Sequence, residues 1–433
     1  MNTTSVSVVK RLDLWVDTAR DVPEDKVQKS LERLIGIFTR FSHLIELTLF
    51  GDGKDLGSFP TMWTSSAQCQ LETIALSISD DITQSKWGGF LTSQPKLRHL
   101  GIYRAKSFEV PPIPSLISMR VELRCGHIRF PDNMSSTLHA LEYLSVRSVD
   151  TLSLLDMPSL KQLHCSDVQR LVMDSEFPNL TDVSLDSIRN STPPTIPLPS
   201  LSKLRMVDVP LHLARGCTTL ASVEFLDHTL VWPRRPHDLE SLKDSALSLR
   251  SLTIREDHRS ESEIPPSYQV IKTFTFLTDL TIEFHSILVR LCWSPFDQKC
   301  PTSSLFGVVK SLKCLQTLSW EVTVLRVDPR ERDPTEEETT DYLDEGIVGG
   351  IVGWLDDMSD GYARTSPSLL HAEFRCRGLG YIYDMPSEET EKLGWWMRHT
   401  RTSIADPFER WALKEEFFLD HNGYRRHIRS WRY

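Results

Sequence analysis

The sequence predicts an α/β fold, an irregular solenoid of stacked repeats with a parallel concave sheet and a partly helical convex side. Three features of the 433-residue chain predict it. A short apolar motif recurs along most of the chain, its copies are spaced by about one strand and one return segment, and prolines recur at one position before it. A single unit of this kind cannot bury its apolar side chains, whereas stacked units share one continuous core.

The recurring motif has six positions, apolar-x-x-apolar-x-apolar. Its last two apolar positions alternate with polar ones, which is the period of a β-strand. The first apolar residue, three positions earlier, anchors the turn that leads into that strand. Clear copies begin at Leu44, Leu71, Leu97, Leu116, Leu141, Leu160, Leu180, Leu201, Leu220, Leu249, Leu277 and Leu315, and weaker copies at Val9 and Leu369.

The spacing of the copies predicts where helices lie. Before Leu97 and after Leu220 the steps are long enough for a helix on the convex side, and Leu31, Leu34 and Phe38 have helical spacing. Between Leu141 and Leu220 the steps are only 19 to 21 residues long. Since a three-turn helix does not fit there, we expect turns or a single 3₁₀ turn.

Proline marks the end of the return segments. It stands two residues before the anchor leucine in six copies of the motif. Proline has no N–H and a fixed φ, so it is tolerated just before a strand but not inside a ladder. The prolines at this position are Pro95, Pro114, Pro158, Pro178, Pro199 and Pro367.

This pattern resembles leucine-rich repeats, and its P-x-L-x-x-L-x-L form is similar to the irregular repeats of F-box/leucine-rich-repeat proteins, especially those of fungi. The resemblance covers roughly Val9 to Arg377. It departs from regular repeats at the third position after the last apolar residue, which is usually Asn or Cys. Here that position holds Asp52, Ser79, Ala105, Arg124, Val149, Val168, Ile188 and Val209.

The resemblance implies a substrate-binding repeat region and, in full members of the family, a short N-terminal helical box that binds a ubiquitin-ligase adaptor. A clear box is not expected here, because a repeat strand already occupies residues 9–14. The segment that begins at Val22-Pro23-Glu24 is weakly similar to a box, and we interpret it as the start of a repeat helix.

The regular pattern stops after Val327, which predicts three segments. Residues 1–327 form the repeat solenoid, 328–346 an acidic loop, and 347–433 a terminal irregular repeat with a helical cap. The acidic segment holds nine Asp or Glu and two Arg, as solvated loops often do. Beyond it we expect a strand over Leu369–Arg375 and helices over 341–358, 387–399 and 407–418.

Charge and composition argue against several classes of protein. The net charge of −10 argues against a general nucleic-acid binder, which needs a basic face. No apolar run reaches the roughly 18 residues of a membrane helix, and the N-terminus lacks the apolar segment of a signal peptide. The eight cysteines form no C-x-x-C pair and read as reduced packing residues. An intracellular protein, cytoplasmic or nuclear, is expected.

Motifs of catalysis are not found in the sequence, so we expect no catalytic residue, no cofactor and no metal site. Ser200 and Lys203 match S-x-x-K, but they flank anchor positions of a repeat. His164 and Cys165 are adjacent on a predicted strand and would point to opposite faces.

A solenoid without catalytic residues usually functions through its surface. The residues that flank the inner apolar positions of each strand point out of the concave sheet, and aromatic residues and Arg among them are favoured interface anchors. Both signs of charge occur, with basic residues mainly in the first half. The predicted partner-binding residues are Trp15, Phe50, His99, Tyr103, Arg120, Tyr143, Arg147, Arg205, Glu224, Arg255 and Glu283.

The leading hypothesis is a non-catalytic protein-interaction module that resembles the substrate-recognition repeats of an F-box ubiquitin-ligase receptor, with a protein partner on the concave face. A ubiquitin-ligase adaptor is a second candidate partner, against which the missing clear box argues, whereas nucleic acid and membrane are not expected partners. Two alternatives stay open. The chain is a repeat scaffold without a ligase link, or an enzyme with an unrecognised site in its C-terminal hundred residues.

Overall fold

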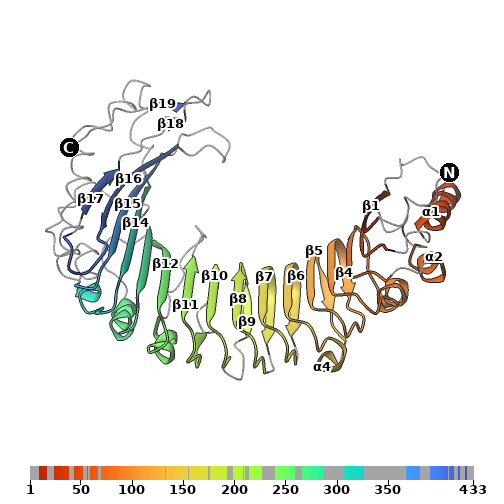
Figure 1. Ribbon diagram of the computed structural model, residues 1–433, viewed down its shortest axis with the longest axis horizontal. Coiled ribbons are helices and arrows are strands. Elements are labelled where there is room, and N and C mark those ends of the chain that lie inside the picture. Colours follow the sequence, from red (N-terminus) through yellow and green to blue (C-terminus); the bar gives the residue numbers. More distant parts are fainter. Residues whose placement is uncertain are drawn as a thin grey trace. The chain divides into compact units, whose positions relative to one another are not determined.

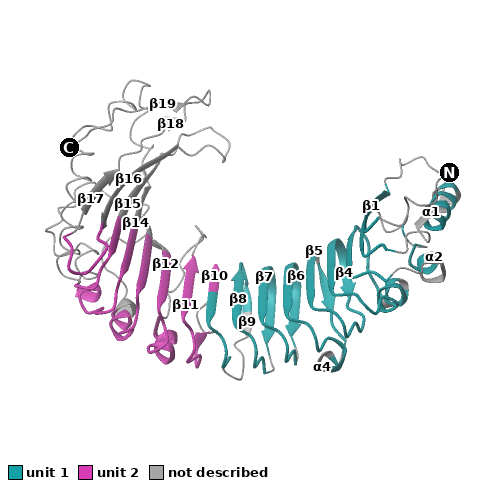
Figure 2. Ribbon diagram, viewed as in Figure 1, with its two compact units in different colours: residues 1–204 teal, residues 205–433 magenta. Residues whose placement is uncertain are grey.

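The computed structural model is built mainly of strands, with few helices, and most of its strands form parallel pairs. Two compact units divide the chain, Met1–Leu204 and Arg205–Tyr433 (Figure 2). The boundary falls inside β10 (Lys203–Val207), within the predicted repeat region. The structure describes residues 9–16, 24–38, 43–51, 56, 59–66, 70–131, 133–154, 156–173, 176–192, 198–207, 209, 214–226, 239–258, 266–286, 307–325, 367–380, 391–407, 409–413, 418–419 and 425–426.

Unit 1 is a ladder of parallel strands in chain order, in which each strand from β1 to β8 pairs with the next (Figure 1). This confirms the predicted strands and their parallel direction. A ninth strand, β9, pairs with β7. The strands are β1 (Arg11–Val16), β2 (Glu46–Gly51), β3 (Thr73–Ile78), β4 (His99–Glu109), β5 (Ser118–Arg129), β6 (Tyr143–Leu154), β7 (Gln162–Met173), β8 (Asp182–Asp186) and β9 (Asn190–Thr192).

The motif positions of unit 1 lie in register across this ladder, so equal positions form buried columns. Leu47 pairs with Ile74 and Ile74 with Leu100, and the column continues to Val183 on β8. The anchor leucines form a second buried column beside it. Each of Leu44, Leu71, Leu97, Leu116, Leu141, Leu160, Leu180 and Leu201 is at most 1% exposed.

The prolines before the anchors close a turn. The N–H of Leu116 donates to the carbonyl of Ile113 at 3.1 Å, and that of Leu160 to Met157 at 3.2 Å. Proline is therefore the second residue of a four-residue turn, a position that its fixed φ favours. The residue between proline and anchor then links neighbouring repeats, because the Ser115 hydroxyl donates to the carbonyl of Leu97 at 2.9 Å. Ser200 makes the same kind of bond to Pro178 at 2.5 Å.

Strands β4, β6 and β7 are longer than the motif predicts, because the chain bends and then continues as strand. Seven residues after the anchor, four residues have a positive φ, which is uncommon outside glycine. These residues are Arg104, Ser148, Asp167 and Ser187, with φ of 53° to 64°. The next residue is buried in each case, so apolar side chains occupy the position where regular repeats have asparagine. They are Ala105, Val149, Val168 and Ile188.

Of the five helices that the structure describes in unit 1, four lie in the long return segments before Leu97, as predicted. They are α1 (Glu24–Phe38), α2 (Phe59–Ser66), the π-helix η2 (Gln84–Gly88) and α3 (Gly89–Thr92), with the short α4 (Met134–Thr137) further on. A cluster of buried rings packs α2 against α3 and η2, with centroids 5.4 to 6.5 Å apart. Its members are Phe59, Trp63, Trp87 and Phe90. Among the described residues from Leu141 to Leu204, the returns contain turns and no α-helix, as the short steps predict.

Unit 2 repeats the parallel pattern with 3₁₀ helices in its described returns. Its parallel strands are β11 (Ser222–Leu226), β12 (Ser251–His258), β13 (Asp279–Ser286), β14 (Thr317–Leu325) and β15 (His371–Gly380), each paired with the next. The returns hold η4 (Leu239–Ser245) and η5 (Pro266–Thr273), which contact each other. The predicted strand at Leu369–Arg375 is confirmed in β15.

The predicted helices over 387–399 and 407–418 are wrong. Residues Glu391–Thr400 form β16, antiparallel to β15, and Glu409–Leu413 form β17, antiparallel to β16. Backbone pairing with β15 outweighs the cap-like start at Ser387, and the aromatic-rich sequence of β16 suits a strand. Two short strands follow, β18 (Phe418–Leu419) and β19 (Arg425–Arg426). The predicted helix over 341–358 and acidic loop 328–346 lie outside the described residues.

Candidate functional site

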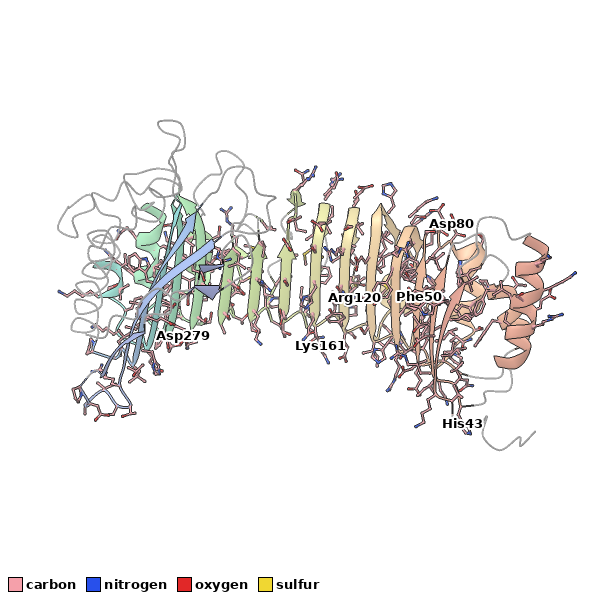
Figure 3. All side chains as sticks on the ribbon, turned by 90° about the horizontal axis from the view of Figure 1, so that it is seen from above. His43, Phe50, Asp80, Arg120, Lys161 and Asp279 are labelled. Carbon is pink, nitrogen blue, oxygen red and sulfur yellow. The ribbon has the colours of Figure 1, made fainter. Side chains whose placement is uncertain are left out.

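The candidate site is the outward face of the strands of unit 1. Strand alternation places Trp15, Phe50, Ser77 and Tyr103 in one row, because register pairs each with the next across β1 to β4. In Figure 3, Phe50 and Arg120 lie along the middle of the strands, whereas His43 and Asp80 lie beyond opposite strand ends. We call Trp15, Phe50, Tyr103 and Arg120 the aromatic surface.

Two stacked rings begin this surface. Trp15 and Phe50 have ring centroids 4.0 Å apart and planes inclined by 15°. The Trp15 side chain is nevertheless 72% exposed, so Phe50 covers only one side of the indole. An indole ring left this open to water is informative, because large aromatic side chains are usually mostly buried.

A glycine positions the next ring. A Cβ atom on Gly101 would lie 2.8 Å from Cε2 of Tyr103, so the tyrosine ring lies over the glycine backbone. Arg120 pairs with Gly101 in register, and its guanidinium carbon lies 5.8 Å from the centre of the Tyr103 ring. Within the described part of the chain, no carboxylate forms an ion pair with Arg120, whose side chain is exposed.

The remaining predicted residues of unit 1, Tyr143, Arg147 and His99, lie on the same face. Tyr143 and Arg147 each contact another side chain. The Tyr143 ring lies 5.4 Å from that of His164, a residue that the sequence analysis did not choose for the surface. Arg147 lies between two carboxylates, 4.0 Å from Glu122 and 3.6 Å from Asp167. His99 is exposed at the start of β4 and pairs with Ser118.

The predicted residues of unit 2 are neutralised in pairs. Arg205 Nε lies 3.5 Å from a carboxylate oxygen of Glu224. Arg255 donates a hydrogen bond to Glu283 on the neighbouring strand, and the two side chains are 23% and 17% exposed. The structure thus brings these four residues together two by two, within unit 2, and leaves little of the second pair accessible.

Small residues beside the rings are part of the aromatic surface and were missed by sequence reasoning. Gly101 pairs with Ala75, and Ser77 separates Phe50 from Tyr103 in the row. The available signal was positional, since Gly101 interrupts a strand that is otherwise rich in large side chains.

On a turn of unit 2, Phe276 is 45% exposed, with the guanidinium of Arg250 5.0 Å from its ring centre.

Residues considered for catalysis have structural roles. The Ser200 hydroxyl donates to a backbone carbonyl, as described above. His164 and Cys165 point to opposite faces, as predicted, since Cys165 is 2% exposed and burial raises the pKa of its thiol. Among the described residues, Cys165, Cys217 and Cys314 form no disulfide. Within the described ranges, no three His, Cys, Asp or Glu side chains gather in a way that could hold a metal ion.

No protein-family model and no curated protein matches this sequence. The function proposed below therefore rests on the sequence and the structure. Among the helices of the described residues, none combines the length and apolar character needed to cross a membrane.

Proposed function

We propose that this chain is a non-catalytic protein-interaction module, built as an irregular leucine-rich-repeat solenoid, which binds a protein partner on the outward face of the strands of unit 1. The repeated parallel strands and the buried leucine columns support the solenoid. Such a scaffold holds side chains from many strands at fixed spacing, about 4.8 Å from strand to strand, which suits recognition of an extended surface.

The observation that carries the proposal is the exposed, stacked indole of Trp15. The uncovered face of this indole stays in contact with water in the isolated chain and adds little to its stability. Covering a large aromatic side chain in a complex stabilises that complex by about 1.5–3 kcal/mol. Trp, Tyr and Arg dominate the binding energy of protein interfaces, and this surface holds one of each within a few strands. The ring of Phe50 already fixes the indole plane, which lowers the entropy cost of ordering it on binding.

A double variant of the aromatic surface tests the proposal. We expect proteins captured by the full chain to be lost when Trp15 and Phe50 are both changed to alanine, and kept with Lys161→Ala. Lys161 is a suitable control, because it is exposed and lies at a strand end, 2.9 Å from Glu142. Quantitative mass spectrometry of the captured proteins is the measurement. The same set of proteins captured by all three forms would contradict the proposal.

The link to ubiquitin ligation is the more specific part of the proposal. We propose that the bound protein is a substrate presented to a ligase, as the resemblance to F-box/leucine-rich-repeat proteins implies, inside the cell. In the described part of the chain, Cys165 and Cys314 form no disulfide, which suits a reducing compartment. Binding of the purified ligase adaptor to the full chain would support the link. Its absence, with partner binding intact, would favour a scaffold without a ligase link.

A further inference from the structure

Among the residues that the structure describes, no acid neutralises Arg120, which lies between two small residues. In register it lies between Gly101 on β4 and Ser145 on β6, so neither neighbour crowds the guanidinium. The acid nearest to it on its own strand, Glu122, faces Arg147 at 4.0 Å. Arg147 is also paired with Asp167. Arg120 therefore has a free hydrogen-bonding edge beside the Tyr103 ring, where a ligand can meet both.

The spacing of the aromatic surface fits a short extended peptide. From Trp15 on β1 to Arg120 on β5 there are four strand steps, about 19 Å at 4.8 Å per step. An extended segment rises about 3.3 Å per residue, so about six residues cover this distance. The three steps from Trp15 to Tyr103 correspond to about four residues, and the last step to Arg120 to one or two.

We infer that the aromatic surface binds an extended protein segment in which two apolar or aromatic residues, about four positions apart, are followed by an aspartate or glutamate. The apolar residues cover Trp15 and Tyr103, and the carboxylate pairs with Arg120. This inference rests on the proposed function and names the class of partner that the surface selects.

Charge complementarity favours a carboxylate over the other groups that a protein segment offers. A basic segment would bring like charge against Arg120, which costs binding energy and slows association. A doubly charged phosphate is usually held by a cluster of arginines, whereas here Arg147 is already paired with two acids. A neutral segment would desolvate the guanidinium without replacing the hydrogen bonds of water. One free arginine beside an aromatic ring therefore matches one carboxylate.

A random peptide library tests this directly. Peptides of about twelve residues displayed on phage, long enough to span the aromatic surface, are selected on the purified full chain. Affinities of the selected peptides are then measured for the parent and for Arg120→Glu, Arg120→Lys and Tyr103→Ala. Arg129→Glu is the matched control, because Arg129 is exposed on the same strand but lies beyond the register shift that follows Glu122. Thermal unfolding of each variant shows that it is folded.

We expect the selected peptides to be enriched in Asp or Glu after apolar residues. Arg120→Glu then lowers their affinity by at least about tenfold and shifts selection to basic peptides, whereas Arg129→Glu changes affinity less than about twofold. One outcome would overturn this inference while the proposed function stands. In that outcome, the selected peptides bind the parent and lose affinity with Tyr103→Ala, but they are not enriched in acids and Arg120→Glu does not affect them. Selection that yields no peptide sensitive to either substitution would overturn both.

Discussion

The strand faces of the two units have the same backbone pattern and differ in what their side chains do. In unit 1, Trp15 is 72% exposed, and the exposed Arg120 lies beside the Tyr103 ring with no ion pair to a described acid. In unit 2, Arg255 and Glu283 bond to each other across neighbouring strands and are mostly covered. A charged residue on the outward face of a parallel strand is therefore not by itself a contact residue, since its neighbour on the next strand decides whether it is available.

The largest expected effect is on binding, at Tyr103. Tyr103→Ala removes the ring that lies over Gly101 and beside Arg120, so it should weaken binding of a selected peptide about 30-fold, equivalent to about 2 kcal/mol. Isothermal titration calorimetry with the full chain is the measurement. Phe276→Ala, which removes a half-exposed ring of unit 2, is the control and should leave affinity unchanged. Equal losses from both variants would remove the distinction between the two faces.

The next effect is on stability, at Glu283. Glu283→Ala leaves Arg255 mostly covered and without its carboxylate, so the free energy of unfolding should fall by about 1–2 kcal/mol. Glu224→Ala, which breaks a more exposed pair, should cost about 0–1 kcal/mol. Chemical denaturation measures both, and peptide affinity should not change in either. A larger loss for Glu224→Ala than for Glu283→Ala would contradict the difference in burial on which the comparison rests.

A smaller effect on binding is expected at Gly101. In Gly101→Val, the new Cβ alone would lie 2.8 Å from Cε2 of Tyr103, and the two methyl groups add further atoms. The Tyr103 ring must therefore rotate away from Arg120. Peptide affinity should fall by about threefold to tenfold, with the fold retained, because a flexible side chain can give way. Gly89→Ala is the control, since a methyl group at Gly89 would have no atom within 4 Å apart from its chain neighbours and its own helix backbone. An unchanged affinity for Gly101→Val would show that the ring position is not part of recognition.

The smallest effect is expected at the turns that link repeats of unit 1. Ser200→Ala removes one side-chain hydrogen bond to the carbonyl of Pro178, and should lower the free energy of unfolding by about 0.5–1 kcal/mol. Ser153→Ala, at an exposed position beyond the bend of β6, should change it by less than about 0.5 kcal/mol. Equal values in chemical denaturation would mean that the serine does not tie the repeats together.

The sequence predicted those parts of the fold that depend on periodic burial. Leucine spacing located the parallel strands, the step length separated helical returns from turns, and proline marked the turn before six of the anchors. The bend at Arg104, Ser148 and Asp167 was not predictable, because a positive φ at a non-glycine residue depends on the tertiary structure around it. β16 was missed for a similar reason, since its antiparallel pairing with β15 cannot be read from the local sequence of residues 391–400.

The candidate site was predicted as a list of outward positions, and the sequence could not rank them. Alternation alone places Trp15, Arg120, Arg255 and Glu283 on the strand faces. Whether such a residue is paired depends on the register between strands, which pairs Arg255 with Glu283 but Arg120 with Gly101 and Ser145. Gly101 was missed because its contribution is the space that it leaves for the Tyr103 ring.

Hydrogen–deuterium exchange of the full chain, with and without a selected peptide, tests most directly the claim that recognition takes place on the strand face of unit 1. Slower exchange on peptide binding is expected in the backbone of β1, β2, β4 and β5, with no change in β11 to β14. Protection confined to the strands of unit 2, or to the helices α1 and α2, would contradict it.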